Sequence, residues 1–173
     1  MDRSQELQFR EFAATWMNHL RGVAYLTCGD WHLAEDAVST AMARLYVRWT
    51  KIDNPVSYVR RVVVNAAIDE RRRPWNRERT YGDSMPDAPG PDVMAPTDDR
   101  DHLRVALSRI PRRQRAVVVL RFYEGLSIEQ VAQILGCSTG TVKSQAARGL
   151  TALRAVLDAE SYQPDEWRVH RTR

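Results

Sequence analysis

A stretch rich in proline and aspartate, residues 74–97, constrains this chain more than any other feature. It holds five of the chain's eight prolines together with Gly82 and Gly90, and it contains few apolar residues. Between Arg79 and Arg100 every charged side chain is an aspartate. Such a composition cannot bury enough apolar surface to form a core and is typical of an extended linker. The chain is therefore predicted to fold as two units, one on each side of this stretch.

Apolar side chains on both sides of the linker recur with the spacing of helices rather than strands. The chain contains only eight glycines, and it has no runs in which apolar and polar residues alternate. Its 173 residues, 43% of them hydrophobic, suffice for two small cores. The predicted fold is all-α, with two small helical domains joined by a flexible linker and a helix-turn-helix in the second. The predicted boundaries are a first domain over residues 1–73, a linker over 74–97, a second domain over 98–160 and a polar tail over 161–173.

Three helices are predicted in the first domain. The second is expected from about Leu33 to about Trp49, because apolar residues form a stripe along it. The third is expected to begin after Asn54, since Asn54 suits a helix N-cap and Pro55 suits the first helical position. It is expected to continue to about Arg73, just before the linker. The apolar face of the first helix is expected to consist of Phe9, Phe12, Trp16, Leu20 and Val23.

Four helices are predicted in the second domain. A first helix is interrupted by Pro111, and a second is expected over residues 112–123. Ser127 followed by Gln130 forms a capping-box pattern that starts a third helix. The last helix is expected over residues 138–158, and the two final helices are joined by a short turn.

The spacing of Ala132, Gly136 and Val142 around this turn is that of a helix-turn-helix. A small residue lets the two helices pass closely, a glycine permits a positive φ at the turn, and Val142 packs the second helix on the first. The outer face of the second helix is small or basic, as a helix entering a DNA groove requires. The alternative is an ordinary helical hairpin with a solvated face. The candidate DNA-contacting residues are Thr139, Thr141, Lys143, Ser144, Ala147 and Arg148.

The helix before the linker carries a second candidate surface. Tyr58, Arg61, Asn65 and Arg72 are predicted to lie opposite its valine stripe, and an arginine-rich block over residues 71–79 indicates nucleic acid. Tyrosine can stack on an unpaired base, asparagine can read a base edge, and arginine can hold phosphate. A merely solvated face is the alternative. We also expect the loop over residues 51–54 to form a pocket with Asn65 for one extruded base.

Several functional classes find no support in the sequence. The two cysteines and four histidines are scattered without metal-ligand spacing, so no metal and no other cofactor is expected. Clustered carboxylates or a nucleophile beside a base are not recognisable, so the chain is not expected to be an enzyme. An apolar N-terminal run and a stretch of transmembrane length are both missing, which predicts a cytoplasmic protein.

The order of these motifs resembles the extracytoplasmic-function (ECF) group of bacterial sigma factors, most of all its actinobacterial SigE-like subgroup. Residues 29–38, GDWHLAEDAV, are similar to the start of the core-binding helix of that family. Residues 54–65, NPVSYVRRVVVN, are similar to its promoter-melting segment. Residues 120–127, LRFYEGLS, and 140–144, GTVKS, are similar to the two halves of its last domain. The resemblance covers about residues 5–157.

This resemblance implies a sigma factor that binds core RNA polymerase and directs promoter-specific transcription initiation. The first domain (region 2) would bind the β′ clamp helices and the minus-10 element, and the second (region 4) the β flap and the minus-35 element. An anti-sigma factor would be a further partner. The resemblance implies minus-10 contacts by Asn54, Tyr58, Arg61, Asn65 and Arg72, and contacts to core polymerase by Glu35, Asp36, Ser39, Thr40 and Arg44.

A stand-alone helix-turn-helix repressor or activator is the alternative function. It would need a dimer surface and a sensing pocket, and neither is recognisable in the sequence. The long acidic linker also disfavours a compact symmetric DNA reader.

Overall fold

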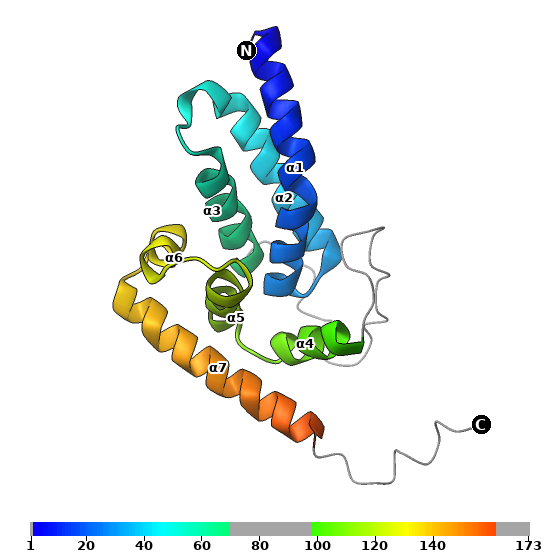
Figure 1. The fold of residues 1–173 in the computed structure, drawn as a ribbon, viewed down its shortest axis with the longest axis vertical. Helices are drawn as coiled ribbons and strands as arrows, with labels where there is room; N and C mark the ends of the chain where they lie inside the picture. Colours follow the sequence, from blue (N-terminus) through cyan, green and yellow to red (C-terminus); the bar gives the residue numbers. More distant parts are fainter. Residues whose placement is uncertain (1, 70–97, 162–173) are drawn as a thin grey trace, which may run out of the picture.

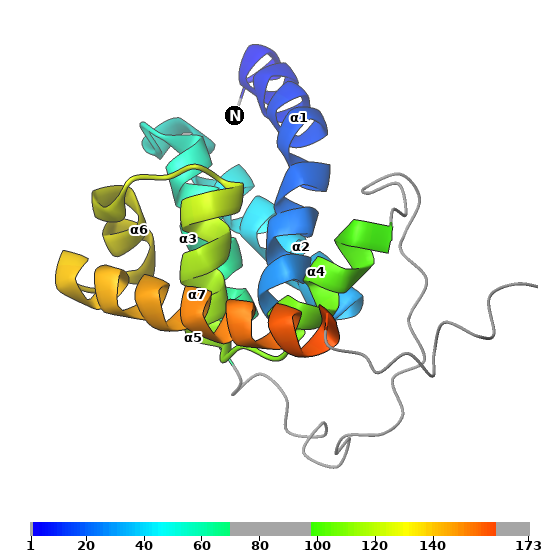
Figure 2. The same ribbon diagram turned by 60° about the horizontal axis from the view of Figure 1, so that its bottom comes forward.

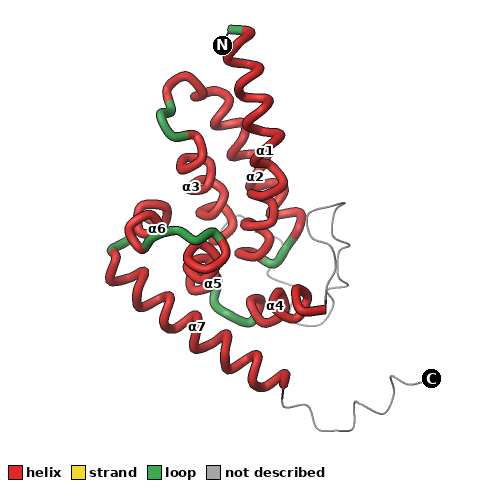
Figure 3. The backbone as a smooth tube through the Cα atoms, in the orientation of Figure 1, coloured by secondary structure: helices red, strands yellow, loops and turns green. Residues whose placement is uncertain are grey.

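The computed structural model describes residues 2–69 and 98–161, and the chain within these ranges is helical with short connections (Figures 1 and 3). The predicted all-α fold is confirmed. The helices of the first part are α1 Arg3–Cys28, α2 Trp31–Arg48, the 3₁₀ turn η1 Trp49–Lys51, and α3 Pro55–Ile68. Those of the second part are α4 Asp98–Ser108, α5 Arg112–Val118, the π-helical turn η4 Val119–Tyr123, α6 Ile128–Leu135 and α7 Thr139–Ser161.

Helices α1, α2 and α3 pack side by side as a three-helix bundle (Figures 1 and 2). Local signals set their ends. Gly29 closes α1 in the left-handed region at φ 75°, and the Asp30 side chain then caps α2. The Asn54 side chain caps α3 ahead of Pro55, as the sequence predicts. The bundle core contains Leu20, Ala24, Cys28, Ala34, Val38, Ala41, Met42, Leu45, Val59, Val63 and Ala67.

The predicted extension of α3 to about Arg73 is wrong at its first testable residue. The helix ends at Ile68, because Asp69 has an extended backbone with φ −70° and ψ 106°. Aspartate is a weak helix former, and its negative charge is unfavourable beside the carbonyl end of a helix. Arg72 and the predicted linker lie outside the described residues, as does most of the predicted tail.

Helices α4 to α7 form the second part, in which α5 and α7 make the largest contact. The capping box predicted at Ser127 and Gln130 is present at the start of α6. Gly136 ends α6 with φ 63°, and Val142 is fully buried behind it. These features confirm the helix-turn-helix predicted from the spacing.

The two parts pack against each other across a shared apolar surface. Val23 and Leu26 of α1 and Val64 of α3 belong to the same buried cluster as Ala116 and Leu120 of the second part. Helix α6 lies beside α3, and α5 lies against both α1 and α3 (Figures 1 and 2). The face of α3 that turns toward α6 is therefore covered in this arrangement.

Two glycines on α7 should respond oppositely to alanine. A Cβ at buried Gly149 would lie 2.7 Å from Cγ2 of Val118 and 3.2 Å from the carbonyl oxygen of Gln114, whereas one at Gly140 would meet only Oγ of Ser138 at 3.7 Å. Alanine normally favours a helix over glycine by about 1 kcal/mol, and we expect Gly140→Ala to raise the free energy of unfolding by about 0.5–1 kcal/mol. Overpacking should dominate in Gly149→Ala, which we expect to lower it by about 1–3 kcal/mol.

Urea unfolding followed by circular dichroism measures both changes. Stabilisation by both substitutions would contradict the close approach of α7 to α5 at Gly149.

Candidate nucleic-acid interface

The first half of α7 projects the candidate recognition residues outward. Ser138 caps the helix, since its Oγ accepts a hydrogen bond of 3.1 Å from the Thr141 amide. Val142 is buried against α6, which fixes the rotation of the helix about its axis. All six predicted contact residues are exposed: Thr139, Thr141, Lys143, Ser144, Ala147 and Arg148. The predicted surface is therefore available to a ligand, with two cations and several small side chains.

One carboxylate lies near this basic face. The pKa of the Glu129 carboxyl is below its usual range, chiefly because its own backbone amide and the Ser127 hydroxyl hydrogen-bond the ionised form. The positive charges of Lys143 and Arg121 contribute in the same direction. Glu129 belongs to α6, so the outer face of α7 itself keeps its positive character.

Three of the predicted minus-10 residues come together on α3. Tyr58, Arg61 and Asn65 line one hollow of about 360 Å³, and Arg44 of α2 joins them from the neighbouring helix. The sequence assigned Arg44 to a different surface, the core-binding face. The hollow brings an aromatic ring, an amide and two guanidinium groups to one place, as a site for an unpaired nucleotide needs.

The pocket hypothesis for the loop over residues 51–54 does not fit this geometry. Oδ1 of Asn54 accepts a hydrogen bond of 3.0 Å from the Ser57 amide, so Asn54 caps the start of α3. Asn65 lies at the other end of that helix, about 16 Å further along at about 1.5 Å per residue. The loop does not line the hollow that contains Asn65. The hypothesis failed because the loop precedes the start of α3, a helix of 14 residues, whereas Asn65 lies near its other end.

The predicted core-binding residues follow one side of α2. Asp36, Ser39 and Arg44 are exposed, and Glu35 and Thr40 are half-buried. The opposite side of α2 supplies Ala34, Ala37, Val38, Ala41, Met42 and Leu45 to the core. The polar side is thus open to a partner.

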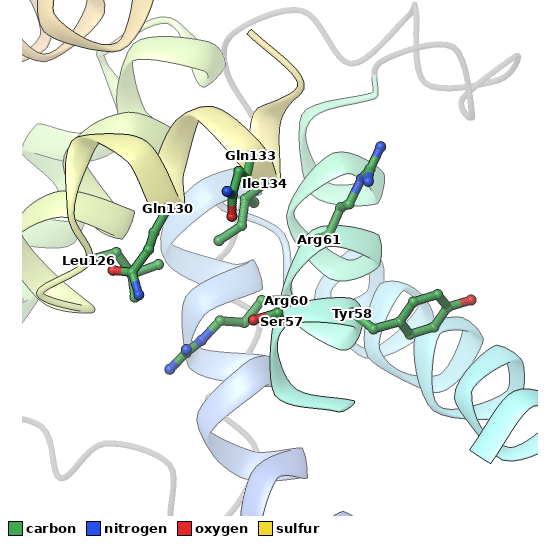
Figure 4. Close-up of a pocket in the computed structure, with 8 residues that line it drawn as sticks. All are labelled: Ser57, Tyr58, Arg60, Arg61, Leu126, Gln130, Gln133 and Ile134. Carbon is green, nitrogen blue, oxygen red and sulfur yellow. The ribbon is translucent and has the colours of Figure 1, made fainter. Parts of the chain in front are cut away.

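A second hollow, of about 230 Å³, lies between α3 and α6 (Figure 4). In the close-up, the Tyr58 ring and the Arg61 side chain both point away from α6. Further along α3, Nδ2 of Asn65 donates hydrogen bonds to the carbonyl oxygens of Arg61 at 2.8 Å and of Ile134 at 3.0 Å. The amide that was predicted to read a base is therefore engaged with the second part of the chain. The hollow is lined by Ser57, Tyr58, Arg60, Arg61, Leu126, Gln130, Gln133 and Ile134.

Two buried charged side chains between the parts escaped the sequence analysis. The Glu124 side chain is 1% exposed and contacts His19 and Arg60 of the first part. The Arg115 side chain donates to three backbone carbonyls, and burial, followed by the nearby charge of Arg112, lowers the pKa of its guanidinium. Arg115 directly precedes the apolar run of residues 116–120, but Arg112, Arg113 and Gln114 precede it, so the sequence carried little signal that this arginine is buried.

Within residues 2–69 and 98–161, no three His, Cys, Asp or Glu side chains come together as metal ligands. In the same residues, no helix is long and apolar enough to cross a membrane.

Comparison with known proteins supports one family. Residues 6–77 match the family description "Sigma-70 region 2", and residues 100–153 match "Sigma-70, region 4". The chain is 36% identical to an RNA polymerase sigma-E factor of Streptomyces coelicolor, over 88% of each chain. It is 33% identical to the ECF RNA polymerase sigma factor SigM of Mycobacterium tuberculosis, over 80% of this chain and 71% of that relative.

A solved structure shares the fold. The sigma factor RpoE of Bartonella quintana, crystallised with the anti-sigma factor NepR, superposes with a TM-score of 0.70. The match covers 87% of this chain and 97% of that one at 22% sequence identity. The two sigma-70 regions and the long matches to curated sigma factors show that the chain belongs to the ECF family of RNA polymerase sigma factors, which bind core RNA polymerase and direct promoter-specific initiation of transcription.

Proposed function

We propose that this sigma factor reads the minus-35 element with α7 and the unpaired strand of the minus-10 element with the outer face of α3. The observation that carries the proposal is the outward face of α7. Its six exposed residues are small, polar or basic, and none of them is acidic. A groove-reading helix needs close approach together with hydrogen-bond donors, and this face offers both.

The role of α3 is supported by the hollow that Tyr58, Arg61, Asn65 and Arg44 share. Opening the duplex costs stacking energy, so an unpaired base needs a replacement partner in the protein. Stacking on tyrosine and hydrogen bonds from the amide supply such partners, while the Arg61 guanidinium neutralises a phosphate. Asn54, at the start of the same helix, and Arg72 complete the set of residues that we propose to contact the minus-10 element.

The polar side of α2 is proposed to bind core polymerase. Glu35 and Asp36 are acidic, and Ser39, Thr40 and Arg44 extend the polar surface along the helix. Charge complementarity with a basic clamp surface would favour fast association.

We assign region 2 to residues 1–73 and region 4 to residues 98–160, joined by a linker over residues 74–97, with a tail over residues 161–173. The protein acts in the cytoplasm, without enzymatic activity of its own, because the catalytic chemistry belongs to the polymerase. An anti-sigma factor is proposed as a further partner, since the structural relative was solved in complex with one.

Run-off transcription with purified core polymerase tests the function. A pool of promoter fragments from the source genome is transcribed by core alone and by core with the full chain. The proposed function requires transcripts with defined start sites that appear only when the chain is added. A stand-alone repressor or activator would bind fragments without giving such transcripts, and that result would refute the proposal.

Arg148→Ala should weaken the upstream contact selectively. A side chain that reads a base contributes about 1–3 kcal/mol, so we expect about a tenfold loss of binding to a minus-35 duplex. Arg154→Ala is the matched control, because Arg154 is exposed on the same helix but points in another direction and is absent from the proposed set. Fluorescence anisotropy with duplex DNA measures both. Equal losses in the two variants would show that only net charge matters.

A further inference from the structure

The α3 face that we assign to unpaired promoter DNA is partly occupied by region 4. Region 4 supplies half of the lining of the hollow in Figure 4, including Gln130 and Ile134 of α6. The Ile134 carbonyl accepts a hydrogen bond from the side-chain amide of Asn65, the residue proposed to read a base. A DNA strand and α6 cannot use that amide at the same time.

One side chain of region 4 stands out in the contact between the regions. Oε1 of Glu124 lies 2.6 Å from Nε2 of His19, and Oε2 lies 2.9 Å from Nε of Arg60. Nε of Arg60 and Oε2 of Glu124 form an ion pair, and neither atom makes a hydrogen bond. Glu124 comes from the end of η4, His19 from α1 and Arg60 from α3, so the carboxylate joins region 4 to two helices of region 2.

Two aromatic rings, of Trp16 and Tyr123, contact this cluster. The Arg60 guanidinium lies 5.2 Å from the centre of the Trp16 ring, which makes an edge-on contact with His19. On the other side, the His19 ring stacks on Tyr123 with centroids 6.3 Å apart. The His19 side chain is 38% exposed, whereas Arg60 and Glu124 are 17% and 1% exposed, so the Arg60–Glu124 pair is the part of the cluster shielded from water, where charges interact more strongly.

The environment of Glu124 depends on the arrangement of the two regions. Packed together, the regions leave 1% of its side chain exposed and provide both partners from region 2. Apart, they would leave the carboxylate without His19 and Arg60. A buried charge is tolerated only with such partners, because removing one leaves an uncompensated charge out of water. The cluster thus favours the closed arrangement, in which the two regions are packed together. Apolar contacts are not directional and do not by themselves select one relative placement of the two regions.

We propose that Glu124 is an autoinhibitory latch. Bound to His19 and Arg60, it holds region 4 against α3 and keeps the amide of Asn65 engaged with the Ile134 carbonyl until the regions separate. The inhibitory part of this proposal rests on the proposed role of α3 in reading unpaired DNA, whereas the latch itself does not.

The latch predicts how DNA binding responds to its removal. When only the open fraction is competent, the apparent dissociation constant equals the intrinsic one divided by that fraction. Breaking the latch therefore raises apparent affinity for single-stranded DNA without adding any contact to it. We expect a gain of about tenfold, because replacing Glu124 leaves the largely buried Arg60 guanidinium without its carboxylate in the closed arrangement, which shifts the closed-to-open equilibrium by at least this factor.

The first measurement follows the arrangement alone. Fluorophores are attached to the full chain through non-natural amino acids at Val47 of α2, which is 80% exposed, and at exposed Arg154 of α7. We expect Glu124→Lys, which opposes Arg60 with a like charge, to lower the energy-transfer efficiency. Glu124→Gln should do so less, and Asp158→Asn, an exposed carboxylate of region 4, should leave it unchanged.

A double variant with exchanged charges tests whether a loss of energy transfer is caused by misfolding. The double variant Glu124→Lys with Arg60→Glu restores an opposite-charge pair, and its energy transfer should recover toward that of the unmodified chain. Circular dichroism verifies helical content in each variant. An unchanged efficiency in both Glu124 variants, or no recovery in the double variant, would overturn the latch.

The second measurement tests what the latch covers. Fluorescein-labelled single-stranded oligonucleotides of randomised sequence are titrated with the unlabelled chain, and anisotropy gives the apparent affinity. The expected result is tighter binding by Glu124→Gln than by Asp158→Asn, because each substitution removes one negative charge and only the first breaks the latch. Loss of energy transfer without tighter binding would keep the latch and refute the proposed role of α3.

Discussion

Arg115→Met should lower the free energy of unfolding by about 3 kcal/mol, which is a large share of the stability of a small protein. The Arg115 residue is 5% exposed. Its Nη2 donates to the carbonyl oxygens of Ser108 at 2.7 Å and Ile110 at 3.0 Å, and its Nη1 donates to that of Thr27 at 3.2 Å. Methionine fills similar volume but donates no hydrogen bond, so three carbonyl groups lose a partner.

The position of Arg115 explains why a buried cation is stable there. Helix α4 ends at Ser108 and α1 ends at Cys28, so the guanidinium lies at the carbonyl ends of two helices. The last carbonyls of a helix lack partners in the helix, and the helix dipole favours a positive charge beside them. Gly29 is part of this site, since a Cβ on it would lie 3.3 Å from Nη1 of Arg115.

Arg113→Met is the matched control for this prediction. Arg113 is exposed on the same helix, and its replacement should change stability by less than about 0.5 kcal/mol. Guanidinium chloride unfolding, followed by circular dichroism, measures both variants. Equal stability of the two variants would show that the buried hydrogen bonds of Arg115 contribute nothing net.

The parts of the fold that sequence reasoning predicted depend on signals only a few residues long. Ser127 caps α6 three residues before its partner Gln130, and Asn54 caps α3 through Ser57. Gly136 takes the positive φ that the turn requires. In each case the residue and its partner are neighbours in the sequence, so their chemistry could be recognised without knowing the fold.

The parts that could not be predicted depend on partners far away in the chain. The carbonyl that Arg115 reaches in Thr27 is 88 residues away, and the one that Asn65 reaches in Ile134 is 69 residues away. Periodicity places a residue on one face of a helix, but it does not identify the helix that packs on that face. Asn65 was therefore assigned to the outer face of α3 correctly, while its contact with α6 was missed.

The recognition surfaces illustrate the same limit. The exposed face of α7 followed from helical periodicity, because Val142 had to be buried for the helix-turn-helix to close. Arg44 was placed with the α2 surface, yet it shares a hollow with Tyr58 and Asn65. Its place depends on how α2 and α3 cross, which is a property of packing rather than of either helix.

Asn65→Ala should reduce transcription from a duplex promoter about tenfold or more. Nδ2 of Asn65 donates at present to the Ile134 carbonyl, and the same donor would be available to a base once the regions separate. A hydrogen-bond pair that reads a base contributes about 1–3 kcal/mol, which is about a fivefold to hundredfold effect on binding. Loss of the Ile134 contact alone would loosen the closed arrangement, and this effect would increase activity. The sign of the change therefore separates the two roles of the amide.

Three templates distinguish how Asn65 acts. If it reads an unpaired base, Asn65→Ala should lose activity on a duplex promoter and equally on one with a pre-melted bubble. The loss should vanish when the base it reads is replaced by an abasic site, because the unmodified protein then has no contact left to lose. A loss confined to the duplex template would instead assign Asn65 to strand opening. Asn18→Ala, an exposed asparagine on α1, is the control for asparagine replacement at a helix surface and should leave all three templates unaffected. Full activity of Asn65→Ala on the duplex promoter would remove Asn65 from the DNA-reading surface, and its contact with α6 would then be its only role among those considered.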